Sequence, residues 1–190
     1  MNRTNTQTIT IFASLAVLMA ATRYNHFGSS VTLPDASLAV FLLAGFFLAR
    51  SRAALPAFVL LLLEAGAVDY YATEFQGVSS WCFSPAYWFL IPTYASLWLG
   101  GRWFAARQRK SWASLALFSG VVWLATTVAF VISNVSFYMF SGRYDVLSLT
   151  EYTAHIMQYY PSYMGSSLMY IAPAVVIYLL VPGLQKRAFA

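Results

Sequence analysis

The most regular feature of the chain is a series of six long apolar stretches separated by short polar segments. They span approximately residues 8–24, 32–49, 54–73, 85–106, 112–140 and 162–182. A helix needs about 17 to 25 apolar residues to cross roughly 30 Å of bilayer hydrocarbon. The stretches lack the alternation, over about ten residues, that is typical of a membrane β-barrel. The pattern therefore predicts an all-α integral membrane protein, with a single transmembrane domain over residues 1–190 and a bundle of six helices.

Three of the six stretches need comment. The second is strictly apolar only over residues 36–49, which predicts an outer end that is irregular or enclosed by protein. The fifth, residues 112–140, is long enough to tilt or to project beyond the bilayer. The first follows Arg3, as the apolar region of a signal peptide would, but no cleavage pattern of small residues follows residues 19–21. We therefore expect a retained first helix.

The composition agrees with a membrane location. Hydrophobic residues make up 60% of the chain and charged residues 9%, whereas an ordinary soluble domain is about 25% charged. The single cysteine excludes an intramolecular disulfide and the chemistry of a membrane disulfide oxidoreductase. The net charge of +5 is not gathered on one solvated face, as nucleic-acid binding requires. We therefore exclude nucleic acid as a partner and expect membrane lipid around the chain.

Basic residues are divided unevenly between the two sides that six spans create. With both termini in the cytoplasm, nine of the eleven Lys and Arg residues fall on the cytoplasmic side, and only Arg23 and Arg143 fall outside. Cytoplasmic segments of membrane proteins carry an excess of Lys and Arg. The distribution therefore predicts a multi-pass protein with both termini in the cytoplasm.

The outer connections are longer than the inner ones and rich in aromatic rings. Rings at a membrane boundary are common as interfacial belts, which accounts for some of them but not for their excess on one side. Several rings with scattered donors and acceptors are typical of an outward-facing pocket for a bulky, amphipathic molecule. The rings concerned are Tyr24, His26, Phe27, Phe75, Trp81, Phe83, Tyr87, Tyr144, Tyr152, Tyr159 and Tyr160.

The lone cysteine lies in the most turn-rich of these connections, residues 79–88. Cys82 stands between Trp81 and Phe83, shortly before Pro85, which suits the first turn of a helix. This arrangement favours a thiol presented to a large, flat ligand. The alternative is that Cys82 is a small buried apolar residue, as free cysteines usually are.

Two acidic residues lie within the third apolar stretch. Glu64 falls near its middle, where a carboxylate costs at least a few kcal/mol unless it is neutralised, paired or hydrated. We favour a protonated side chain bonded to a neighbouring helix over a proton path. Asp69 lies nearer the outer boundary, and it either accepts hydrogen bonds from ligand amides or pairs with Arg23 or Arg143.

The two histidines, His26 and His155, are both placed outside, and only folding can bring them to Cys82. A set of Cys, His and carboxylate would permit nucleophilic catalysis, but no local nucleophile motif is present. Neither histidine has a second ligand at zinc-binding spacing.

Six spans in 190 residues, the small residues Ala16 and Ala20 in the first helix and ring-rich outer loops resemble the substrate-binding S components of energy-coupling factor (ECF) vitamin transporters. In that family an AxxxA pattern of this kind docks on a shared coupling subunit. The lone cysteine before the fourth helix, in Ser80-Trp81-Cys82-Phe83-Ser84-Pro85, is similar to the loop of the cobalamin-specific members.

The resemblance implies uptake of cobalamin (vitamin B12) across the cytoplasmic membrane of a prokaryote, from a pocket that faces outside. Cobalamin is then the transported ligand, and no intrinsic cofactor is expected. Cys82, as thiolate, would be the axial ligand of cobalt in a base-off corrinoid, since sulfur suits that position, and removal of an upper cyano ligand is a side activity. The remaining substrate-binding residues are predicted from loop position alone: Tyr87, Asp69, Trp81, Phe83, His26 and Arg143.

The chain has no Gly-rich phosphate loop of the GxxxxGK type, so the energy for transport must come from another protein. The resemblance implies an ECF coupling subunit and two ATPases as partners, with docking at Ala16 and Ala20. Three alternatives stay open: an S component for another vitamin, a small membrane enzyme with Cys82 as nucleophile, and a structural or assembly subunit.

Overall fold

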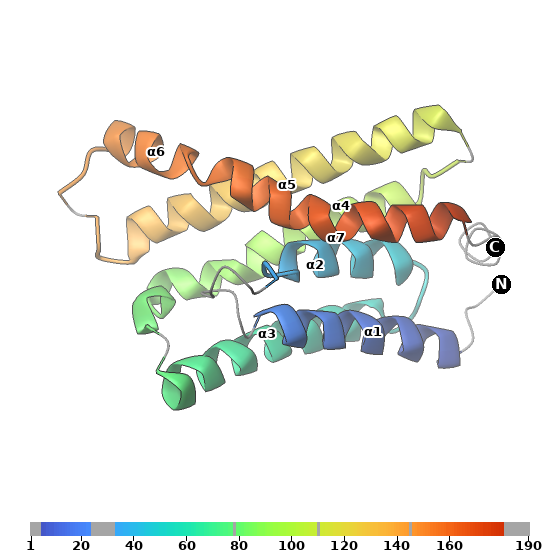
Figure 1. Ribbon diagram of the computed structural model, residues 1–190, viewed down its shortest axis with the longest axis horizontal. Coiled ribbons are helices and arrows are strands. Elements are labelled where there is room, and N and C mark those ends of the chain that lie inside the picture. Colours follow the sequence, from blue (N-terminus) through green and yellow to red (C-terminus); the bar gives the residue numbers. More distant parts are fainter. Residues whose placement is uncertain (1–4, 24–32, 78, 110, 145, 181–190) are drawn as a thin grey trace.

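The computed structural model describes residues 5–23, 33–77, 79–109, 111–144 and 146–180, and of Cys82 it describes the backbone but not the side chain. All regular elements within these residues are helical (Figure 1). There are seven α-helices and two short 3-10 helices: α1 (Asn5–Arg23), α2 (Ser37–Phe47), α3 (Ala54–Gln76), η1 (Ser80–Cys82), η2 (Pro85–Phe89), α4 (Leu90–Ala105), α5 (Trp112–Phe140), α6 (Leu149–Met157) and α7 (Tyr160–Leu180).

The long helices α1, α3, α5 and α7 are each long and apolar enough to cross a membrane. Helices α2 and α4 lie between them and are shorter, at 11 and 16 residues. Successive long elements run in opposite directions, and α1 begins at the end of the bundle where α7 finishes (Figure 1). The prediction of an all-α, multi-pass membrane protein is confirmed. The six spans and the cytoplasmic termini stay predictions.

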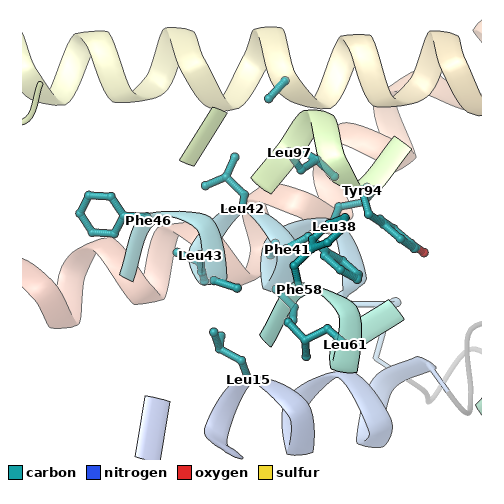
Figure 2. Close-up of a cluster of buried hydrophobic side chains, with 14 of the residues drawn as sticks. Leu15, Leu38, Phe41, Leu42, Leu43, Phe46, Phe58, Leu61, Tyr94 and Leu97 are labelled. Atoms are coloured by element: carbon teal, nitrogen blue, oxygen red, sulfur yellow. The ribbon is translucent and has the colours of Figure 1, made fainter. Parts of the chain in front are cut away.

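Helix α2 is the centre of the bundle. Every residue from Ser37 to Phe46 is buried. A helix that is apolar on all sides is expected inside protein, and 11 residues reach only about 17 Å, too short for a bilayer. Figure 2 shows Leu15 of α1, Leu61 of α3 and Leu97 of α4 around its side chains.

Two glycines allow α2 and α4 to cross in direct backbone contact. A Cβ atom on Gly45 would overlap the carbonyl oxygen of Trp98, and one on Gly101 would overlap the carbonyl oxygen of Leu42. Small residues at such a crossing let the helix axes approach closely. Because each glycine faces backbone of the other helix, no side-chain movement would make room for a larger residue.

Two predicted spans begin later as α-helices than expected. Helix α2 starts at Ser37, not at residue 32, because Asp35 accepts bonds from both the backbone N–H (2.9 Å) and the hydroxyl (2.6 Å) of Ser37, which form a turn before the helix. The span predicted from residue 85 starts as the 3-10 helix η2, and α-helical bonding begins only at Leu90.

Other boundaries differ at the outer ends. Helix α3 continues to Gln76, past the predicted end at residue 73, and stops at Gly77, whose left-handed φ of 66° ends it. Helix α7 begins at Tyr160, two residues before the prediction. Helix α6 was not predicted; its N-terminus is fixed by a capping box between Ser148 and Glu151. The fifth span, α5, has the predicted bounds.

Candidate functional site

The segment that carries Cys82 lies near the finish of α3 and α5, which we call the aromatic end (left in Figure 1). The hydroxyl of Ser79 accepts a bond from the backbone N–H of Trp81 (3.3 Å), and the N–H of Phe83 donates to the carbonyl of Ser80 (2.9 Å). These bonds close η1 around the backbone of Cys82. The Cys82 thiol lies outside the described part of the chain, so its role stays a prediction.

The two rings that flank Cys82 are exposed: Trp81 retains 48% of its accessible surface and Phe83 39%. Arg143, in the connection after α5, lies over the Trp81 ring at 3.9 Å from its centroid. Its Nε also donates to the Trp81 carbonyl oxygen at 3.1 Å. Arg143 therefore joins η1 to the end of α5 by a cation–π contact and a hydrogen bond.

Tyr87 connects η1 to the interior. Its ring stacks on Phe83, with centroids 4.7 Å apart, and its hydroxyl donates to Oδ2 of Asp69 at 2.7 Å. Tyr87 is half-buried, and burial together with the neighbouring Asp69 carboxylate raises the pKa of its phenol above the usual value of 10.0. The phenol therefore stays protonated and donates to Asp69 throughout the neutral range.

Beneath Tyr87 lies a buried ionic network centred on Arg23, the last residue of α1. Its Nε donates to Oδ1 of Asp69 at 2.8 Å, and its Nη2 donates to Oδ2 of the same carboxylate at 2.5 Å. Its Nη1 donates to Asp35 (3.2 Å), Ser37 (2.9 Å) and Tyr94 (2.7 Å). One guanidinium thus holds together the ends of α1, α2, α3 and α4.

The network is buried, so loss of any one contact costs more stability than it would at the surface. Arg23 is 4% exposed and Asp69 is 8% exposed. Buried charges require partners with good geometry, and the bidentate pairing of Arg23 with Asp69 supplies it. Arg23 also ends a helix, where a cation is favoured by the helix dipole. The network holds Asp69 in place, and the Tyr87 hydroxyl is bonded to this carboxylate.

Many rings of α6 and of the connection before it pack on one another. Tyr152 of α6 contacts Tyr138 and Tyr144, each at 4.8 Å between centroids, and its hydroxyl donates to the Asn134 carbonyl at 2.9 Å. Burial raises the pKa of Tyr152 to about 12. The exposed His155 contacts Tyr144 and Tyr159 (ring centroids 6.5 and 5.7 Å apart). These rings fix α6 against α5.

The predicted substrate-binding residues fall into two groups. Trp81, Phe83, Tyr87, Asp69 and Arg143 come together at the aromatic end, from four separate parts of the chain. Asp69 pairs with Arg23, whereas Arg143 stacks on Trp81, which decides between the two partners that the sequence allowed. His26, like the Cys82 thiol, lies outside the described residues.

Sequence reasoning missed Tyr94 and Ser37 as members of the network. Tyr94 follows Tyr87 by seven residues, a spacing that shares a face only within one α-helix. Because Tyr87 lies in η2 and Tyr94 in α4, this spacing was not a reliable signal. Ser37 gave no signal either, because its role depends on the turn formed with Asp35. Among the described residues, no group of three or more His, Cys, Asp and Glu side chains is placed to hold a metal ion.

Ala20 lies on the side of α1 that faces α3, four residues after Ala16. Ala16 packs against the edge of the core. Ala20 lines an open groove of about 430 Å³ between the two helices, together with Glu64 and Tyr71. Glu64 is half-buried, and its carboxyl group contacts the backbone of Ala20. The predicted contact of Glu64 with a neighbouring helix is thus present, and the small residues accommodate it.

Comparison of the chain with protein-family models and with curated proteins finds no match.

Proposed function

We propose that the chain binds cobalamin at the aromatic end and takes part in its uptake across the cytoplasmic membrane of a prokaryote. The observation that carries the proposal is the placement of the Cys82 backbone in η1, between the exposed rings Trp81 and Phe83. Arg143 fixes this turn to α5, and Tyr87 anchors the following turn to Asp69. The turn that bears the only cysteine is therefore held in place by contacts on both sides.

The chemistry of these groups suits a corrinoid. Cobalamin is a broad corrin ring with amide groups at its rim and a cobalt ion at its centre, and a thiolate is a suitable soft axial ligand. Cys82 coordinates the cobalt from the lower face in place of the cofactor's own benzimidazole. Trp81, Phe83 and Tyr87 cover the corrin edge, and Arg143 and His26 offer polar partners to the amides. Asp69 contributes by holding the Tyr87 hydroxyl.

A ligand exchange follows from this binding mode. The thiolate electron pair forms the Co–S bond, the benzimidazole nitrogen leaves the lower face, and an upper cyanide departs as the anion with its electron pair. Cobalt remains Co(III), and water takes the vacated position. Loss of cyanide from cyanocobalamin is thus a side activity of the binding site.

Uptake requires a source of energy outside the chain, which has no GxxxxGK phosphate loop. We assign this to an ECF coupling subunit with two ATPases, in the manner of S components. The small residues Ala16 and Ala20, beside the groove between α1 and α3, support docking of a partner helix at this face.

The test compares wild type with Cys82→Ser for binding of a panel of vitamins, for cobalt content and for the absorption spectrum. Wild type should bind cobalamin alone, carry about one cobalt per chain and shift the spectrum of the bound corrinoid. Cys82→Ser should lose the spectral shift and most of the affinity.

A matched control keeps a thiol in the same turn but moves it. The double variant Ser80→Cys/Cys82→Ser retains one cysteine two residues earlier and should bind no better than Cys82→Ser. Unchanged affinity and spectrum in Cys82→Ser would contradict coordination by this thiol. Tight binding of another vitamin with no cobalt present would assign the pocket to that vitamin instead.

A further inference from the structure

The end of the bundle opposite the aromatic end encloses a cavity of about 360 Å³. We call this the basic end, because Arg102, Arg107 and Arg109 lie there. The cavity is bounded by the ends of α2, α4 and α7 and by the first turns of α5. Its walls are mainly apolar: Leu43, Phe46, Phe47, Phe104, Leu115, Phe118, Ala174, Val175 and Leu179.

Polar groups gather on one side of this cavity. Gln108, Arg109 and Ser111, all in the segment between α4 and α5, contribute to its lining. The backbone N–H of Arg109 donates to the Ser114 hydroxyl at 2.9 Å, which fixes Arg109 against the first turn of α5. The Tyr178 hydroxyl donates to Gln108 at 3.3 Å and closes α7 against the same segment. The cavity thus combines mainly apolar walls with an exposed arginine, Arg109, among its lining residues.

The cavity lies at the level where the long apolar helices meet the membrane boundary. Two apolar helices long enough to span begin and end there, α5 at Trp112 and α7 at Leu180. Trp112 is 87% exposed and Trp103 is 44% exposed, and exposed tryptophans are enriched at the level of lipid headgroups. A molecule that fills this site must carry both a hydrocarbon chain and a negative charge.

We propose that the cavity binds one anionic phospholipid, with part of an acyl chain among the Phe rings and the phosphate at Arg109. Basic pockets between membrane helices are known to hold such headgroups. This site is separate from the proposed cobalamin site and does not depend on it.

The test is native mass spectrometry of the full chain in mild detergent, titrated with phosphatidylglycerol or with phosphatidylcholine of the same acyl chains. Wild type should bind one phosphatidylglycerol more tightly than phosphatidylcholine. Arg109→Gln should bind phosphatidylglycerol about fivefold more weakly, the effect of one cation near a lipid surface. The matched control is Arg107→Gln, which removes the same charge two residues away, from a side chain stacked on Trp103 at 4.1 Å. It should bind as wild type does.

Two further variants test the apolar part. Ala174→Phe and Leu115→Trp place a larger side chain in the cavity, and either should reduce binding of both lipids. Size-exclusion elution and thermal melting show which of the two variants is folded. Lipid binding is then measured on that variant. Equal losses in Arg109→Gln and Arg107→Gln, or full binding in a folded filled variant, would overturn the proposal. So would a complex of two chains that excludes lipid.

Discussion

The two ends of the bundle differ in the partners of their arginine side chains. At the aromatic end, Arg23 is buried and bonded to two carboxylates, Asp35 and Asp69. At the basic end, Arg102 and Arg107 lie over the faces of Trp98 and Trp103, at 4.7 and 4.1 Å from the ring centroids. Both ion pairs found within the described residues involve Arg23. A buried charge needs partners at fixed positions, whereas a charge on a ring near water does not. In the part of the chain that the structure describes, ionic contacts therefore fix the arrangement of the aromatic end and not that of the basic end.

The largest effect is expected from removal of the central cation. Arg23→Gln leaves the buried Asp69 without its partner, and loss of one member of a buried pair costs about 3–5 kcal/mol of unfolding free energy. The measurement is denaturant or thermal unfolding in detergent. Arg107→Gln at the basic end is the control, with an expected cost below about 1 kcal/mol. Similar losses in the two variants would show that burial does not distinguish the two ends.

A smaller loss is expected at the edge of the network. Tyr87→Phe removes the hydroxyl that donates to Asp69 at 2.7 Å, and a hydrogen bond to a charged group contributes about 1.5–3 kcal/mol. We expect the lower part of this range, since Asp69 keeps both bonds to Arg23. Tyr178→Phe, which removes a longer bond of 3.3 Å to neutral Gln108 at the basic end, should cost less. The reverse order in unfolding experiments would contradict this ranking.

Alkaline pH should act on the aromatic end. Burial raises the pKa of Tyr152 to about 12 from its usual 10.0, so the folded state favours the neutral phenol. Its contribution to stability is complete below about pH 10 and is lost as the pH rises through 12. Tyr152→Phe should therefore reduce the slope of unfolding free energy against pH in this window. An unchanged slope in Tyr152→Phe would contradict this assignment.

The smallest effect on stability compares two similar pairs. Arg143 lies over Trp81 and Arg107 over Trp103, at 3.9 and 4.1 Å, and an exposed cation–π contact contributes about 0.5–1 kcal/mol. Arg143→Gln and Arg107→Gln should therefore lower the melting temperature by similar small amounts. Only Arg143→Gln should weaken cobalamin binding, measured by titration. Equal cobalamin affinity in both variants would exclude Arg143 from the site.

The sequence predicted helices well where a polar boundary coincided with a cap. The fifth span was correct at both ends because Ser111 caps α5 just where the apolar run begins. The capping box Ser148-Leu149-Thr150-Glu151 marks the start of α6 in the same way, but we did not consider it and assigned the segment to a connection between spans. Apolar length alone was a poor guide to α2, whose start is set by the turn at Asp35.

The sequence predicted which residues belong to the candidate site better than it predicted which residues they contact. Asp69, Tyr87 and Arg143 were identified from their position near the outer boundary, but the choice of Arg23 as the partner of Asp69 needed the packing of α1 against α3. Tyr87 illustrates the reason. We predicted one helix over residues 85–106, whereas Pro85–Phe89 is a 3-10 turn, and the direction of a side chain there does not follow from α-helical spacing.

The crossing of α2 with α4 has a consequence for how the chain is made. Helix α2 is too short to rest across a bilayer by itself, and the glycine surface that receives it is completed only when Gly101 has been synthesised. Until then its all-round apolar side chains have no protein neighbour on that face. We therefore expect a chain that ends before Leu90 to leave Ser37–Phe47 without the neighbour against which it packs in the finished bundle.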